Sequence, residues 1–155
     1  MQTSTKKHYY LFIWISCILL ISLTIGNITK TSVNDWYLTL NKSSLTPPGY
    51  VFGLVWSTLY IMIASSGWLI WQQKNQLVKK LFITQMMLNW LWTPLFFGFN
   101  LITPALICLL LLSIVLSWLV FNLLKKSKQA GLLLVPYYLW SLFALYLNFY
   151  IWIYN

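Results

Sequence analysis

The amino-acid sequence predicts an all-α membrane protein built as a bundle of five transmembrane helices, and two observations predict this fold class. The first is composition: 60% of the 155 residues are hydrophobic and 7% are charged, and the mean hydropathy of +0.74 exceeds that of a water-soluble domain. The second is a set of four uncharged stretches, which cover Tyr9–Thr29, Ser43–Gln73, Leu81–Leu124 and Gln129–Asn155. Each can cross a bilayer, because about 20 apolar residues in a helix span its ~30 Å hydrocarbon layer.

The third stretch is too long for one crossing, since a single helix over it would measure about 66 Å. Gly, Asn and Pro interrupt the stretch between Gly98 and Pro104, so we expect the chain to fold back there. One transmembrane domain over residues 1–155 is therefore predicted, with spans at Tyr9–Ile28, Pro48–Trp71, Lys80–Phe97, Pro104–Leu124 and Gly131–Tyr154. A β-barrel is disfavoured, because these stretches far exceed strand length and do not alternate apolar and polar residues.

The lysines predict the orientation of this bundle. With five spans, one side carries only Lys30 and Lys42 together with Asp35, the one acidic residue of the chain. The other side carries the remaining eight lysines, which are Lys6, Lys7, Lys74, Lys79, Lys80, Lys125, Lys126 and Lys128. The positive-inside rule then predicts a cytoplasmic N-terminus and an external C-terminus, as in a bacterial inner membrane. The net charge of +9 is an orientation signal and not a nucleic-acid footprint, because no soluble basic domain accompanies it.

The first span carries little specific information beyond packing. Its lysine pair and apolar run also fit a secretory signal, but the run exceeds the usual length and lacks a small-residue cleavage site. Cys17 and Cys108 lie inside spans and are expected to be small buried hydrophobes, since neither belongs to a metal-binding pattern.

The first loop, residues 29–47, is long enough to form a lid over a binding site, with an unstructured connector as the alternative. The second span follows it at Pro47-Pro48, where the first helical turn tolerates proline. Phe52, Trp56 and Tyr60 recur every fourth residue and therefore share one helix face.

The third span is the most polar in its middle. Gln85, Asn89, Trp92 and Phe96 fall on one face, and amides in hydrocarbon turn toward the bundle interior or a cavity. The sequence leaves two interpretations of these amide side chains, an interhelical hydrogen bond and a contact with a ligand. Pro94 is expected to bend the outer end of this helix.

The fifth span places Trp140, Phe143 or Ala144, and Leu147 on one face. Counted from the outer surface, Trp56 and Asn89 both lie about 12 Å deep and Trp140 about 20 Å deep. We therefore expect faces of the second, third and fifth spans to line one pocket, open to the outside and capped by the first loop.

The residue inventory excludes most enzyme classes. One Asp, no Glu and a single histidine, His8, on the side opposite the expected opening, cannot supply an acid–base pair, a catalytic triad or a metal site. An aromatic pocket suits a flat aromatic molecule that stacks on rings. Lys30 or Lys42 is available for an anionic group on such a ligand, while the chain has no arginine for a bidentate clamp.

Three stretches also carry a family resemblance. Residues 35–60 read DWYLTLNKSSLTPPGYVFGLVWSTLY and resemble the signature W-Y-x-x-L-x-K-P-x-W-T-P-P-x-x-V-F-x-x-V-W-T-x-L-Y of the translocator protein family, also called tryptophan-rich sensory proteins, TspO/MBR proteins or peripheral-type benzodiazepine receptors. Residues 85–97 resemble its Q-x-x-L-N-x-x-W-S-x-x-F-F, and residues 134–152 its L-x-P-Y-x-x-W-x-x-F-A-x-x-L-N-x-x-I-W. The match runs in order along nearly the whole chain.

The resemblance implies a bacterial member with a five-helix bundle, commonly a homodimer, around a pocket for protoporphyrin IX, haem, and isoquinoline or benzodiazepine-type ligands. No cofactor or metal is obligatory, and porphyrin is the ligand. Together with the helix faces above, it gives the expected binding residues, which are Tyr37, Pro47, Phe52, Trp56, Tyr60, Asn89, Thr93, Phe96, Trp140, Ala144 and Leu147. The expected role is a sensor or scavenger of porphyrins. The alternatives are light-dependent porphyrin degradation, for which Trp56 and Trp140 are the implicated pair, and porphyrin or sterol transport.

The chain departs from the family pattern at three places. In the third span, the family's W-S reads Trp92-Thr93 and is followed by the unusual Pro94. The family's K-P-x-W before the two prolines reads Lys42-Ser43-Ser44-Leu45 here, so a loop tryptophan is missing from the expected lid. The cholesterol motif of animal members, L-N-Y-x-x-W-R, has neither its tyrosine nor its arginine in residues 147–153, and such motifs are weak patterns in any case.

Overall fold

A computed structural model describes residues 2–28 and 36–155, with side chains from Tyr9 onward, and in these ranges the chain is helical with no strand. An all-α fold is thus confirmed. The elements in chain order are α1 (Gln2–Ile28), the short α3 (Trp36–Thr39), α4 (Gly49–Trp71), α5 (Gln76–Thr93), the π-helical turn η1 (Pro94–Gly98), α6 (Ile102–Lys126) and α7 (Lys128–Tyr154). Residues 29–35 of the predicted lid lie outside the described ranges.

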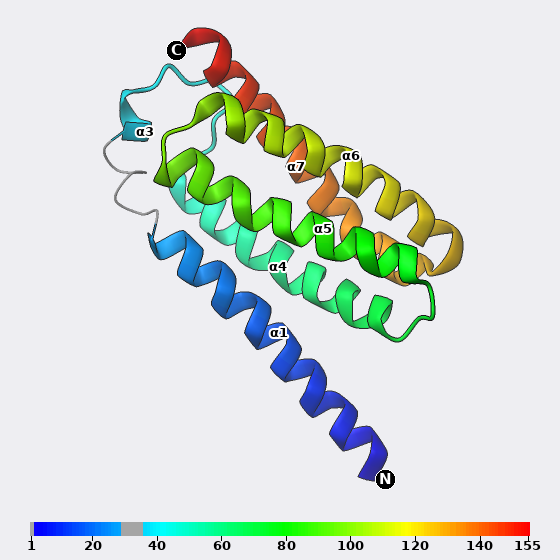
Figure 1. Ribbon diagram of the computed structural model, residues 1–155. Coiled ribbons are helices and arrows are strands. Elements are labelled where there is room, and N and C mark those ends of the chain that lie inside the picture. The colour runs from blue at the N-terminus through cyan, green and yellow to red at the C-terminus, as the bar shows by residue number, and fades with distance from the viewer. Residues whose placement is uncertain (1, 29–35) are drawn as a thin grey trace.

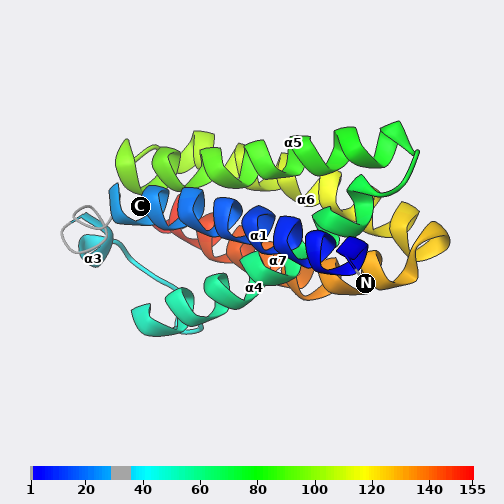
Figure 2. The same cartoon turned by 90° about the horizontal axis from the view of Figure 1, so that it is seen from below.

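Four long helices, α4 to α7, form the body of the bundle and run alternately up and down (Figure 1). Their facing sides are apolar, and Ile63, Leu109, Leu116 and Leu134 are fully buried among them. Helix α1 lies on the outside of this body against α4 and α5 (Figure 2). Ile18 is its one buried hydrophobic residue among the described side chains.

Two tryptophan indoles attach α1 to the body. Trp14 Nε1 donates to the carbonyl of Ala64 at 2.9 Å, and Trp90 Nε1 donates to Ser22 Oγ at 3.2 Å. Both bonds pair polar groups within the protein, as a hydrocarbon surrounding requires. Helix α1 is therefore fixed by a few directed contacts more than by a shared core, and this leaves room between it and α4.

Four helices among the described residues are long and apolar enough to cross a membrane, which makes the chain an integral membrane protein. Their spans are Tyr9–Asn27, Gly49–Trp71, Ile102–Lys126 and Lys128–Tyr154. Helix α5 does not reach this apolarity, because its 18 residues include Lys79, Lys80, Gln85 and Asn89. The count of five spans remains a prediction, although α5 packs along α6 within the bundle.

The reversal between α5 and α6 falls at residues 99–101, inside the expected hinge. Pro94 has no N–H to donate, and from there the helix widens into η1, where the amide of Phe99 donates to the carbonyl of Pro94 at 2.9 Å. Asn100 then adopts a φ of 57°, which the short polar side chain of asparagine tolerates. The expected bend at Pro94 is thus realised as a π-helical turn.

The packing of α4 against α5 generates one stability prediction. A Cβ added at Gly67 would lie 2.5 Å from Cζ of Phe82, a ring that is 2% exposed. Gly67→Ala should therefore overpack this contact, destabilise the fold by about 1–3 kcal/mol and lower the melting temperature in detergent. Gly53→Ala is the matched control on the same helix, because its Cβ would meet no atom within 4 Å. Equal melting temperatures for the two variants would contradict the prediction.

Candidate ligand-binding pocket

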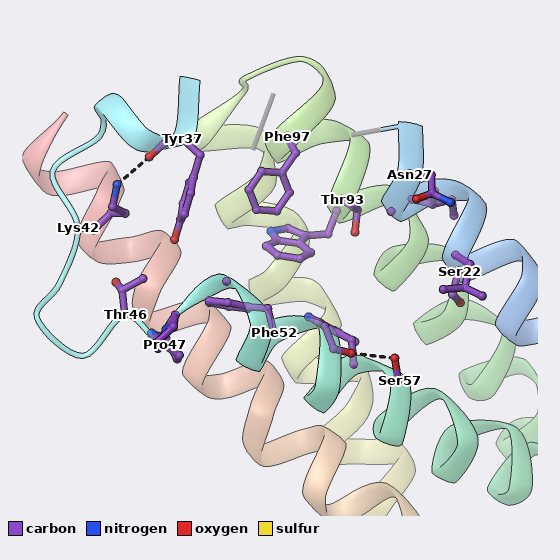
Figure 3. A pocket seen from close by; sticks show the side chains of 18 of the residues that line it. Ser22, Asn27, Tyr37, Lys42, Thr46, Pro47, Phe52, Ser57, Thr93 and Phe97 are labelled. Carbon is purple, nitrogen blue, oxygen red and sulfur yellow. Dashed lines mark hydrogen bonds between the residues drawn. The ribbon is translucent and has the colours of Figure 1, made fainter. Parts of the chain in front are cut away.

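A cavity of about 1130 Å³ opens at the end of the bundle that also carries α3 and the C-terminus (Figures 1 and 3). Helix α1 forms one wall, α4 the opposite wall, the end of α5 and η1 the floor, and the loop from Tyr37 to Pro48 the remaining side. This volume lies just above the usual range of about 300–1,000 Å³ for small-molecule sites, so the cavity admits a large flat molecule.

Trp56 of α4 is the centre of the aromatic wall. Its ring lies 5.5 Å from that of Tyr60, 6.4 Å from that of Trp92 and 6.2 Å from that of Tyr137, measured between centroids. Tyr60 and Trp92 line the cavity with it, whereas Tyr137 is fully buried behind it. The α4 wall is therefore supported from α5 and α7 and presents a preformed stacking surface.

The loop contacts the bundle through aromatic rings. Tyr37, in α3, lies edge-on to Phe97 at 5.4 Å and to Phe96 at 6.1 Å, and Trp36 lies edge-on to Phe96 at 5.3 Å. Figure 3 shows Tyr37 and Phe97 side by side where the loop meets the cavity floor. Burial raises the pKa of the Tyr37 phenol, which therefore stays neutral at physiological pH.

Lys42 is the one charged side chain among the described residues that line the cavity. Its Nζ donates to the carbonyl of Tyr37 at 2.9 Å and to that of Leu38 at 3.3 Å, and it lies 4.9 Å from the centroid of the Tyr37 ring. These contacts stabilise the carbonyl end of the four-residue helix α3 and hold a positive charge at the rim.

The loop is also hydrogen-bonded to the C-terminal part of α7 and to Asn155. The backbone amide of Asn41 donates to Asn155 Oδ1 at 2.9 Å, and Asn155 Nδ2 donates back to the carbonyl of Asn41 at 3.2 Å. Ser43 is buried, and its hydroxyl lies 2.9 Å from that of Tyr146. We call these contacts the lid latch. They occur where the expected family tryptophan is missing, so polar contacts hold the loop there.

The structure brings six of the eleven expected residues to the large cavity, namely Tyr37, Pro47, Phe52, Trp56, Tyr60 and Thr93. Three others, Phe96, Ala144 and Leu147, line a small void of about 30 Å³ that shares Tyr37 and Phe52 with the cavity. Trp140 lines neither and packs against Phe52 at 5.8 Å. The fifth span thus contributes the layer behind the wall, because Phe52 lies between it and the cavity.

Asn89 is buried and bonded between helices. Its Oδ1 accepts from the hydroxyl of Tyr60 at 2.6 Å, and the residue is 1% exposed. Of the two interpretations that the sequence left open, the structure has the interhelical hydrogen bond. Asn89 therefore fixes Tyr60 in the cavity wall without lining the cavity itself.

Helix α1 was underestimated by the sequence analysis, which assigned it packing alone. Its last turns form a full wall of the cavity through Leu19, Ser22, Leu23, Ile25, Gly26 and Asn27. The available signal was weak: Ser22 and Asn27 are polar, but so are Ser16 and Thr24 in the same span. Sequence spacing could not reveal which helix this face meets. Trp92 and Phe97 also line the cavity and were not among the expected binding residues.

Comparison with known proteins decides the family. The model of the TspO/MBR family matches residues 13–153. The chain belongs to this family. Similar proteins include the tryptophan-rich protein TspO of Archaeoglobus fulgidus, 38% identical over 130 residues that cover 82% of this chain and 84% of the relative.

Relatives with other names fall in the same range. The human translocator protein is 36% identical over 123 residues, covering 76% of this chain and 73% of its own length. The tryptophan-rich sensory protein of Cereibacter sphaeroides is 31% identical over 117 residues, covering 75% and 74%. The family expected from the three sequence stretches is confirmed, and each of these TspO/MBR relatives shares most of its length with this chain.

The Tyr60–Asn89 bond gives a second stability prediction. Tyr60→Phe removes the donor and leaves a buried carbonyl oxygen without this partner, which should cost about 1–3 kcal/mol and lower the melting temperature. Tyr50→Phe, at a side chain that is 79% exposed, is the matched control and should melt like the unaltered protein. A Tyr60→Phe variant that melts no lower than this control would show that the bond contributes nothing.

Proposed function

We propose that the protein is a membrane tetrapyrrole-binding protein that senses or scavenges porphyrins such as protoporphyrin IX and haem. The observation that supports this most directly is the cavity of about 1130 Å³ with aromatic rings on two sides and a lysine at its rim. A porphyrin is flat, aromatic and apolar except for its two carboxylates, so rings and one cation match its chemistry. Flat isoquinoline and benzodiazepine-type molecules fit the same description apart from the carboxylates.

The macrocycle would stack on Trp56, with Tyr60 and Phe52 on the same wall and Tyr37 over it from the loop. Lys42 Nζ would exchange its carbonyl partners for a ligand carboxylate, because this ammonium group lies at the rim where the carboxylate of a bound ligand would be. The described cavity-lining residues include no His, Cys or Met, and Tyr37 and Tyr60 are the side chains there of a type that also ligates haem iron. The binding that we propose depends on shape and stacking.

The other expected residues would act on the ligand through this wall. Trp140 supports Phe52, Asn89 orients Tyr60, and Phe96 supports Tyr37. Ala144 and Leu147 line the small void behind them, which four shared side chains, Tyr37, Phe52, Trp92 and Phe97, separate from the cavity. We assign these five residues to pocket shape and the cavity-lining six to direct contact.

We further propose the orientation that the lysines predict, with the cavity end outside and the lysine end cytoplasmic, in a bacterial inner membrane. The six lysines of the α4–α5 and α6–α7 turns support it, because they lie at the end of the bundle opposite the cavity (Figure 1). A homodimer is proposed from the family resemblance alone.

Light-dependent degradation of the bound pigment is the second candidate, and the placement of Trp56 on the cavity wall favours it. An excited porphyrin would be in contact with Trp56, whereas Trp140 is separated from the cavity by Phe52. The two tryptophans of the implicated pair would then differ in importance.

Titration with protoporphyrin IX, followed by tryptophan quenching, tests binding. Trp56→Leu should weaken affinity about tenfold, because it removes the central stacking surface. Trp118→Leu, at an exposed indole on α6, is the control for the loss of one fluorophore and should bind normally. Absence of saturable quenching in the unaltered protein would reject the proposal.

The same titration separates stacking from charge when it is repeated with a porphyrin that has no carboxylates. Lys42→Met should weaken protoporphyrin IX by up to about fivefold and leave the carboxylate-free porphyrin unchanged. Equal losses for both ligands would indicate that Lys42 acts by holding the loop and not by meeting the ligand.

Irradiation of the protein with bound protoporphyrin IX tests the second candidate. If Trp56 is the direct partner of the pigment, Trp56→Phe should slow pigment loss more than Trp140→Phe, at equal occupancy and light dose. Pigment loss at the unaltered rate in both variants would remove the pair from the reaction.

A further inference from the structure

The end of the bundle opposite the cavity carries a concentrated positive charge. The α4–α5 turn and the first turns of α5 contribute Lys74, Lys79 and Lys80, and the α6–α7 turn contributes Lys125, Lys126 and Lys128. Five of these side chains are exposed and Lys79 is half-buried. We call these six residues the lysine end.

The two turns lie beside each other. Figures 1 and 2 both place them at the same end of the molecule. Ser66 Oγ, near the end of α4, donates to the carbonyl of Ala130, in the first turn of α7, at 2.9 Å. A Cβ on Gly131 would lie 2.9 Å from the amide nitrogen of Leu124, so α6 and α7 also meet closely here. The six charges therefore belong to one surface.

The protein itself cannot neutralise this surface. The whole sequence has one acidic residue, which lies outside the described ranges and on the other side of the predicted topology. Six like charges at one end repel one another unless anions come from outside. An anionic partner would therefore stabilise the lysine end.

The neighbouring side chains indicate which anion it is. Trp71 and Phe121, near the ends of two candidate membrane spans, are 43% and 58% exposed. Lys79 Nζ lies 5.9 Å from the Trp71 ring and Lys125 Nζ lies 3.9 Å from the Phe121 ring. Aromatic rings with lysines beside them at a helix end are typical of the boundary between hydrocarbon and headgroups. A bilayer presents phosphates at that level.

We propose that the lysine end binds anionic phospholipid headgroups, with the six ammonium groups meeting the phosphates of lipids that carry a net negative charge. This interaction compensates for the low apolarity of α5, because Lys79 and Lys80 hold its first turns at the headgroup level. The binding is independent of the tetrapyrrole cavity at the other end. It requires anionic lipid, since zwitterionic headgroups bring their own cation.

The test is a lipid titration of the detergent-solubilised full chain, read by native mass spectrometry at low salt, with phosphatidylglycerol against phosphatidylcholine. The unaltered protein should bind phosphatidylglycerol more tightly. The variant Lys125→Gln, Lys126→Gln, Lys128→Gln should lose about fivefold in affinity per lysine. Replacing the same three lysines by arginine keeps the charge and should keep the preference.

Three outcomes would overturn the proposal. The first is equal affinity for the two lipids, and the second is an unchanged lipid preference in the glutamine variant. The third is displacement of phosphatidylglycerol by equimolar soluble glycerol phosphate, which would indicate a free-phosphate site. Tight binding of polyglutamate without a lipid preference would assign the surface to an acidic protein instead. If the glutamine variant does not fold, the salt dependence of the unaltered protein tests the proposal. Raising the salt concentration screens the charges and should abolish the preference for phosphatidylglycerol, and a preference that persists contradicts the proposal.

Discussion

The side chain of Trp92 is the contact on which the bundle and the cavity both depend. Its ring stacks on Trp56 of α4 and on Phe96 of η1, with centroids 6.4 and 5.9 Å apart. Its Nε1 donates to Asn148 Oδ1 of α7 at 3.2 Å, and Asn148 Nδ2 reaches the carbonyl of Ile102 in α6 at 3.4 Å. One residue thus links the four helices of the body, and it also lines the cavity. The floor of the site is therefore built from the same contacts that join the helices of the bundle.

The same chemistry recurs at several helix contacts in this protein, although buried polar atoms of Gln85 and Trp140 have no partner among the described residues. Indole and amide groups pair across helices because hydrocarbon offers no water to replace a missing partner. Trp14 and Trp90 attach α1 in this way, and Asn89 attaches Tyr60. Many tryptophans thus serve two purposes, since the ring supplies apolar contact and the N–H supplies direction. An aromatic-rich sequence is therefore no direct measure of how many rings meet a ligand.

The helical period of about 3.6 residues predicted which residues line the cavity where those residues all belong to one helix. Phe52, Trp56 and Tyr60 share a face in the sequence and share the cavity wall in the structure. The period failed where the helix changes type: η1 follows Pro94, and Phe97 faces the cavity while the expected Phe96 packs behind it. Spacing within a helix also does not show which helices pack against each other. The α1 wall and the position of Trp140 behind Phe52 could therefore not be predicted from it. The family resemblance supplied the ligand class but not this layering.

The departure from the family pattern in the loop, at Lys42-Ser43-Ser44-Leu45, coincides with a change in how the loop is attached to the bundle. Where the family tryptophan is missing, the loop is held by hydrogen bonds. The lid latch joins Asn41 to Asn155, which are both exposed, and joins Ser43, which is buried, to Tyr146. The ring contacts of Tyr37 with Phe96 and Phe97 are kept. The loop is thus attached beside the cavity floor by ring contacts and at its far side by hydrogen bonds.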